Sequence, residues 1–177
     1  MGAAGRPRRS CLAVPGSSVK MLDKAQGLAA DQVFLDLEDA VAPLAKPDAR
    51  KNIVAALNGG DWGGKVRVVR VNDLTTQWTY ADVVEVVEGA GANLDAIMLP
   101  KVQDAAHVQW LDLTLTQIER AVGLPVGGIG IEAQIENARG LVNVDAIAAA
   151  SPRVETIIFG RPTSWRRSTC ARSSLVR

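Results

Sequence analysis

The sequence is poor in cysteine, the residue that cross-links small secreted domains, since only two occur among its 177 residues. Cys11 and Cys170 lie far apart and form no metal-type or redox motif, so we expect no disulfide framework and two reduced, inert thiols. No apolar run reaches the roughly 18 residues of a membrane span. Residues 1–9 carry arginines without the apolar segment of a signal peptide behind them. We therefore expect a cytoplasmic protein without membrane contact.

Acidic residues are absent from the last part of the chain. Residues 161–177 hold five arginines and no acid, which leaves 15 basic and 19 acidic residues in 1–160, a net charge of −4 there. A basic tail can bind nucleic acid through its charge, and this is one interpretation of 161–177. The whole chain has a net charge of +1 and 47% hydrophobic residues, which is typical of one soluble globular domain with a sizeable core.

Nearly continuous apolar runs alternate with helical patterns at intervals of about 25 to 35 residues, which is typical of serial βα units on a parallel sheet. The predicted strands are 10–14, 33–39, 65–71, 96–100, 129–136 and 154–159. The predicted helices are 18–30 with Ser17 as its N-cap, 48–57, one that begins near Thr79, 104–122 and 143–150.

Polar side chains gather at the carboxyl ends of these strands. They are Asp36, Glu38, Asp39, Arg70, Asn72, Lys101 and Glu136. A barrel brings all of these ends to one mouth. A doubly wound sheet is the alternative, but Pro15-Gly16-Ser17-Ser18 after the first strand lacks the G-x-G-x-x-G spacing of its phosphate loop. We expect the TIM (β/α)8-barrel family, and because eight units take about 250 residues, 1–160 should form an incomplete barrel of about six strands and five helices.

The run from Ile129 to Leu141 ends a strand on a carboxylate and turns directly into a helix. Glu132, Gln134 and Glu136 share one face of this strand, which suits a polar barrel mouth better than a dry core. Glu136 at the strand end has the position of a site residue. The alternative is a glutamate that simply begins a helix, where the helix dipole favours it.

Short motifs follow one another in order along most of the chain. They are Arg8-Arg9-Ser10, Val14-Pro15-Gly16-Ser17, Asp36-Leu37-Glu38-Asp39-Ala40-Val41-Ala42-Pro43, Lys46, Ala49-Arg50, Val69-Arg70-Val71-Asn72, Met98-Leu99-Pro100-Lys101-Val102, Gln134-Ile135-Glu136-Asn137-Ala138-Arg139-Gly140-Leu141 and Ile158-Phe159-Gly160. From Arg8 to Gly160 the chain resembles the HpcH/HpaI aldolase and citrate lyase superfamily, and within it the citrate lyase β-subunit-like (CitE-like) CoA-ester lyases.

The resemblance implies a homo-oligomeric, Mg²⁺-dependent TIM-barrel enzyme that cleaves or forms a carbon–carbon bond in acyl-CoA thioesters such as citryl-, malyl- or citramalyl-CoA. In such enzymes the arginine that matches Arg70 clamps the substrate carboxylate, and the glutamate that matches Glu136 binds the metal and contacts the substrate. A guanidinium suits bidentate carboxylate binding, and Mg²⁺ prefers oxygen ligands. The alternative for Arg70 is a structural pair with Asp36 or Glu38.

Other motif residues have supporting roles by position and charge. Three carboxylates are candidates to hold Arg70 and metal-bound waters, although the last two equally suit capping of their loop: Asp36, Glu38 and Asp39. Three cations are candidates for the phosphates of CoA, with a solvated surface as the alternative: Arg8, Lys46 and Arg50. Lys101 has the same two interpretations.

The single histidine weighs against a related activity. The free 2-oxo-acid aldolase branch of the superfamily resembles this chain in fold but uses a histidine near its site as a base. His107 lies in the predicted helix 104–122, away from any strand end, and is expected at the surface. The CoA-ester branch is therefore favoured, with the free 2-oxo-acid aldolase as the alternative.

The chain departs from the resemblance after Gly160. Relatives continue with Pro-Ala-Asp-Phe-Met-Ala, whose aspartate is the second metal ligand, whereas here Arg161-Pro162-Thr163-Ser164-Trp165-Arg166 follows. One base restored in the Gly160 codon can turn these codons into the family motif, so we interpret 161–177 as an out-of-frame tail, which makes nucleic-acid binding unnecessary to explain it. Thr163 then replaces a carboxylate by a neutral hydroxyl, a poor Mg²⁺ ligand, and we expect little or no activity in this reading frame. Sequencing the gene across codons 159–167 tests the interpretation.

Overall fold

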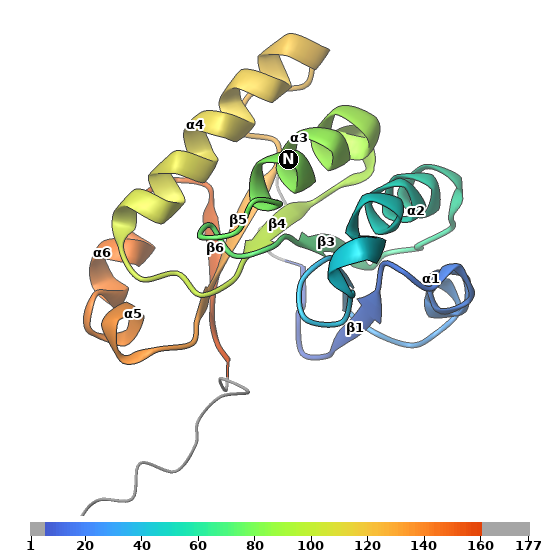
Figure 1. The fold of residues 1–177 in the computed structure, drawn as a ribbon, viewed down its shortest axis with the longest axis horizontal. Helices are drawn as coiled ribbons and strands as arrows, with labels where there is room; N and C mark the ends of the chain where they lie inside the picture. Colours follow the sequence, from blue (N-terminus) through green and yellow to red (C-terminus); the bar gives the residue numbers. More distant parts are fainter. Residues whose placement is uncertain (1–5, 161–177) are drawn as a thin grey trace, which may run out of the picture.

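Six parallel strands form one sheet in the order in which they occur along the chain (Figure 1). The structure is a computed structural model that describes residues 6–160. The strands are β1 (Cys11–Pro15), β2 (Gln32–Asp36), β3 (Val66–Arg70), β4 (Ala96–Leu99), β5 (Gly130–Ile135) and β6 (Val154–Phe159). A doubly wound sheet reverses its strand order at an internal strand, whereas a barrel keeps the sequential order seen here. The predicted α/β fold of the TIM-barrel family is confirmed.

The helices follow the strands around one side of the sheet (Figure 1). They are α1 (Val19–Gln26), α2 (Lys46–Gly59), α3 (Thr79–Ala90), α4 (Ala105–Val122), α5 (Ala138–Val142) and α6 (Val144–Ala148), with short 3₁₀ turns at Pro43–Ala45 and Gly91–Asn93. From α1 to α4 each helix packs against the next, and α4 also contacts α6. This is the helix arrangement of the outer ring of a barrel.

Alternate residues of the strands pack into two separate cores. The larger core joins the helices to one face of the sheet and includes Val33, Leu35, Val69, Ile97 and Ile131. A smaller core lies on the opposite face and consists of Val66, Val68, Ala96 and Met98, with Phe34 and Ile158 packed against it. Because both faces are covered, the strands have the continuous apolar sequences from which they were predicted.

Several element boundaries differ from the prediction: α1 ends at Gln26 and not at residue 30, and β2 ends at Asp36 and not at residue 39. Ser18, and not Ser17, is the N-cap of α1, where its side chain accepts a hydrogen bond from the amide of Met21 at 3.3 Å. The helix predicted to follow Glu136 and to contain 143–150 is two short helices, α5 and α6, because Asn143 has non-helical backbone angles and separates them.

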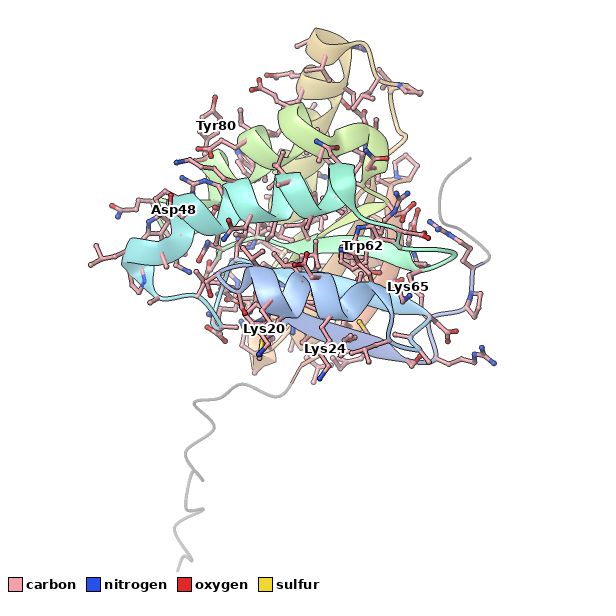
Figure 2. All side chains as sticks on the ribbon, turned by 90° about the vertical axis from the view of Figure 1, so that its right-hand side faces the viewer. Lys20, Lys24, Asp48, Trp62, Lys65 and Tyr80 are labelled. Carbon is pink, nitrogen blue, oxygen red and sulfur yellow. The ribbon has the colours of Figure 1, made fainter. Side chains whose placement is uncertain are left out.

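The residues just before β3 make hydrogen bonds to α1 and α2 on the side of the molecule that Figure 2 shows. Trp62 is 3% exposed and donates its indole N–H to the carbonyl of Ala56 at 3.0 Å. Lys65 donates from Nζ to the carbonyl of Gln26 at 2.7 Å. Both contacts lie far from the carboxyl strand ends and therefore serve the fold alone.

No helix among residues 6–160 combines the length and the apolar character needed to cross a membrane. The predicted basic tail, 161–177, lies outside the described residues, as do Thr163 and Cys170 within it.

Candidate functional site

The polar side chains predicted to share a barrel mouth do meet at the carboxyl ends of β2 to β5. In the parallel register Asp36 is paired with Arg70, the last residues of β2 and β3. A cavity of about 300 Å³ opens beside them, which we call the mouth cavity. Its polar lining includes Glu38, Asp39, Lys46, Asn72, Asp73 and Lys101. The strand order thus gathers groups from distant parts of the sequence into one site.

Arg70 is held by two carboxylates, and we call these three residues the clamp. Its Nε and Nη2 donate to the two oxygens of Asp36 at 2.8 and 2.7 Å, and its Nη1 lies 3.3 Å from Glu38 Oε2. The ring of Phe34 lies under the guanidinium, 5.1 Å from its carbon to the ring centre. Burial opposes ionisation of Asp36, but the hydrogen bonds from Arg70 prevail and lower its pKa. The structural pairing of Arg70 is therefore present: Asp36 takes two hydrogen bonds, and Glu38 makes an ion pair with Nη1 without hydrogen-bond geometry.

Lys101 connects the clamp to Glu136. Its Nζ donates to Glu38 Oε1 at 2.8 Å, and its backbone N–H donates to Glu136 Oε2 at 3.1 Å. Burial raises the pKa of Glu38 and of Glu136 in spite of the cations beside them. Asp39 is exposed at the rim of the mouth cavity. The predicted group of Asp36, Glu38, Arg70 and Glu136 is thus brought together, and Asp39 lies at its edge.

The charges of this group fit an additional cation. Two cations, Arg70 and Lys101, face three carboxylates, those of Asp36, Glu38 and Glu136. Glu38 Oε2 is buried without a hydrogen-bond partner. Within residues 6–160, however, no three His, Cys, Asp or Glu side chains lie close enough to hold a metal ion alone. Mg²⁺ would therefore need Glu136 together with oxygens from substrate, water or a further carboxylate.

Lys46 and Arg50, predicted to contact CoA phosphates, are buried in the protein. Lys46 is 4% exposed and uses all three N–H donors, on the carbonyls of Leu37 and Glu38 and on Asn72 Oδ1. Arg50 is 6% exposed and donates to two carboxylates of α3, Asp82 and Glu85. The donors of Lys46 are thus occupied by neutral oxygens and Arg50 is paired with carboxylates, which argues against the predicted phosphate contacts.

Arg8, the third predicted phosphate ligand, lies at the opposite end of the sheet from Arg70. Its guanidinium contacts Glu155 and lies 3.2 Å from Glu132, which is completely buried. Gln32 at the start of β2 donates to the same Glu132 at 3.0 Å. Arg8 therefore lies away from Arg70, and its contact with CoA phosphates stays a prediction. Glu132 was expected at the barrel mouth because it shares a face with Glu136, but it lies toward the amino end of the barrel interior.

Two further predictions concern Cys11 and His107. Cys11 is an exposed residue, but loss of solvation around its thiol, helped by the charge of Glu132, raises the pKa of the thiol to about 11. His107 has a side chain 26% exposed, and its Nδ1 accepts from the amide of Gln103 at 3.4 Å. His107 is therefore half-buried at the surface and lies on α4, away from the clamp.

Cys11 should react slowly with alkylating agents at neutral pH. Because the thiolate is the nucleophile, a pKa near 11 should make its reaction with iodoacetamide roughly a hundredfold slower than that of free cysteine at pH 7.5. The rate should rise as the pH approaches the raised pKa. Peptide mass spectrometry after timed labelling measures this at Cys11 separately from Cys170, and labelling of Cys11 as fast as free cysteine would contradict it.

Lys101 had two interpretations from the sequence, a contact to the CoA phosphates and a solvated surface residue. Lysine rarely adopts a left-handed backbone, so the φ of 52° at Lys101 could not be predicted from the sequence. The stacking of Phe34 on Arg70 was also not anticipated, because Phe34 reads as an ordinary strand residue. Only its place in the period of two, facing the same side as Asp36, gave a signal.

The chain is similar in sequence to a family model and to proteins of known activity. A family model described as HpcH/HpaI aldolase/citrate lyase matches residues 9–162. The L-malyl-CoA/beta-methylmalyl-CoA lyase of Cereibacter sphaeroides is 47% identical over 155 residues, which are 88% of this chain and 48% of that protein. The (3S)-malyl-CoA thioesterase of the same species is 39% identical over 160 residues, 90% of this chain and 51% of that protein. The chain spans about half the length of the curated relatives it matches.

One solved structure is similar to this chain in both sequence and fold. Protein CitE from Mycobacterium tuberculosis, in complex with magnesium, acetoacetate and coenzyme A, is 31% identical with a TM-score of 0.62. The match covers 85% of this chain and 49% of that one.

Proposed function

Because the chain belongs to the HpcH/HpaI aldolase/citrate lyase family, we propose that its fold serves a Mg²⁺-dependent carbon–carbon lyase for malyl-CoA-type thioesters. The observation that supports this most strongly is the group of Arg70, Glu38, Lys101 and Glu136 at the strand ends where barrel enzymes carry their sites, with Glu38 and Lys101 lining the mouth cavity. The similar malyl-CoA lyase and the similar CitE structure with magnesium and coenzyme A support a CoA thioester as the substrate.

Arg70 is suited to orient the carboxylate of the substrate. Asp36 occupies Nε and Nη2 and fixes the plane of the guanidinium. Nη1, which lies 3.3 Å from Glu38 without a hydrogen bond, would donate to the substrate carboxylate in a defined direction. Cleavage of malyl-CoA moves the hydroxyl proton to a base, converts the C–O bond to a carbonyl and breaks the adjacent carbon–carbon bond. The products are glyoxylate and, after protonation of the released carbon, acetyl-CoA.

Glu136 is the described residue that would hold Mg²⁺. Its carboxylate is half-buried, has a raised pKa and accepts one hydrogen bond, from the amide of Lys101. When bound, Mg²⁺ would supply positive charge to the substrate oxygen that becomes negative as the bond breaks. The second carboxylate is proposed to come from the family motif that one restored base places at position 163.

The product of malyl-CoA turnover tests this function. We call the protein made after restoring one base in the Gly160 codon the frame-restored protein. With Mg²⁺ it should convert malyl-CoA to acetyl-CoA and glyoxylate, and the chain with Thr163 should show little turnover. Absence of turnover by the frame-restored protein, or condensation of pyruvate with an aldehyde without CoA, would contradict the proposal; the latter would favour the free 2-oxo-acid aldolase.

Hydrolysis of the thioester is a second candidate function, favoured by the likeness to the malyl-CoA thioesterase. Both reactions use the same substrate, but hydrolysis releases malate and free CoA. Separation of acetyl-CoA from CoA by chromatography in the same assay therefore distinguishes the two.

Arg70→Lys should weaken substrate binding more than it slows the chemical step. Lysine keeps the charge but cannot bind Asp36 and a substrate carboxylate in one plane, so we expect KM to rise about tenfold or more with a smaller change in kcat. Steady-state kinetics of the frame-restored protein with and without this substitution measure KM and kcat separately. Arg67→Lys is the matched control, because Arg67 lies on the same strand and pairs with Asp95 at the other end. Equal KM values for the Arg70→Lys variant and the unchanged protein would remove Arg70 from the substrate site.

A further inference from the structure

Lys101 holds an unusual position between two carboxylates of the mouth. Among residues 6–160 it supplies the only hydrogen bond to the side chain of Glu38 and the only one to the side chain of Glu136. One bond comes from its side chain and the other from its backbone. A single residue thus connects the clamp to the proposed metal ligand.

The backbone of Lys101 is strained in the way that this double contact requires. It is the one non-glycine residue with positive φ in the described part of the chain, at 52°. Rotation about the bond from N to Cα sets the angle between the N–H and the side chain, so φ decides whether both partners can be reached at once. Such strain persists when surrounding contacts impose it, and it is concentrated at functional sites.

The neighbouring residues leave little freedom to Lys101. Pro100 precedes it, and the next amide, that of Val102, donates to the carbonyl of Gln134 at 3.0 Å. The Lys101 side chain is 40% exposed, so it reaches the mouth cavity without being part of the apolar core.

We propose that Lys101 is a positioning residue that fixes the distance between the clamp and Glu136. It acts through Glu38 and Glu136 and makes no direct contact with the reacting bond. The role in turnover rests on the proposed lyase function. The pair of hydrogen bonds from Lys101 to Glu38 and Glu136, which we call the tie, does not.

The tie is tested in the 177-residue chain by hydrogen exchange at the amide of residue 101. Lys101→Met removes the donor of the side-chain bond and Glu38→Leu removes its acceptor, so each should speed this exchange by about tenfold or more, as expected for loss of a charged hydrogen bond. Lys51→Met is the matched control, because Lys51 is 74% exposed and pairs with Asp48. Unchanged exchange at residue 101 in both test variants would overturn the proposal.

Kinetics of the frame-restored protein test the consequence for catalysis. Lys101→Met should lower kcat by about tenfold or more with KM almost unchanged, and Lys101→Arg should recover most of the rate. Lys101→Gly suits the left-handed backbone and should keep the thermal midpoint while kcat still falls. A raised KM at constant kcat, or full activity of Lys101→Gly, would overturn the positioning role. If the unchanged protein turns over no CoA thioester, the lyase proposal fails, and hydrogen exchange alone decides on the tie.

Discussion

Replacing Glu136 by glutamine in the frame-restored protein is expected to slow malyl-CoA cleavage by about two to three orders of magnitude, the usual loss when one transition-state interaction is removed. Glutamine keeps the size of the side chain and can still accept from the amide of Lys101 at the position that Glu136 occupies. It removes one negative charge from the proposed Mg²⁺ site, so both the affinity for the metal and the stabilisation of developing charge should fall. Steady-state kinetics and calorimetric titration with Mg²⁺ measure the two effects separately.

Glu88→Gln is the control for this substitution. Glu88 is an exposed glutamate on α3, outside the mouth cavity, and its loss should change neither the rate nor the affinity for Mg²⁺. A Glu136→Gln variant with the rate of the unchanged protein would show that Glu136 only begins a helix, the alternative that the sequence left open.

The Arg153→Met variant of the 177-residue chain is expected to lose about 3 to 5 kcal/mol of unfolding free energy, the usual cost of removing one partner of a buried ion pair. The Arg153 side chain is 4% exposed, and it lies directly before β6. Its guanidinium contacts the fully buried Glu119 and Asp112, both on α4. Methionine fills part of the space but leaves Glu119 buried without its cation. Urea unfolding followed by circular dichroism measures the change.

Arg139→Met is the matched control, since Arg139 is 67% exposed and pairs with Asp104 at 3.1 Å. An exposed pair contributes about 0 to 1 kcal/mol, so the stability should barely change. A loss at Arg153 no larger than that at Arg139 would contradict the importance of the buried pair.

The pH dependence of this effect follows from Glu119. Burial alone would raise its pKa, but the hydrogen bonds from Arg153 prevail and lower it. A lowered pKa in the folded state gives stability that is present above the unfolded value, about 4.3, and is lost as the pH falls through the folded value. The difference between the unchanged chain and Arg153→Met should therefore be largest near neutral pH and should shrink below about pH 4.

The sheet was predictable from the sequence because strands buried on both faces are apolar throughout, and because parallel strands end at one edge. That rule also brought Asp36, Arg70 and Glu136 together correctly. It could not place Glu132, because a period of two gives the face of a strand but not the depth in a barrel. The burial of Lys46 depends on Asn72, 26 positions away, a contact that no local pattern reveals.

We propose that Glu136 provides one of two carboxylates of a Mg²⁺ site beside the Arg70 clamp. Calorimetric titration with Mg²⁺ of the 177-residue chain and of the frame-restored protein tests it most directly. We expect clear binding of Mg²⁺ by the frame-restored protein, weak binding by the chain with Thr163, and loss of binding in the frame-restored Glu136→Gln variant. Equally tight binding of Mg²⁺ by all three proteins would contradict the claim.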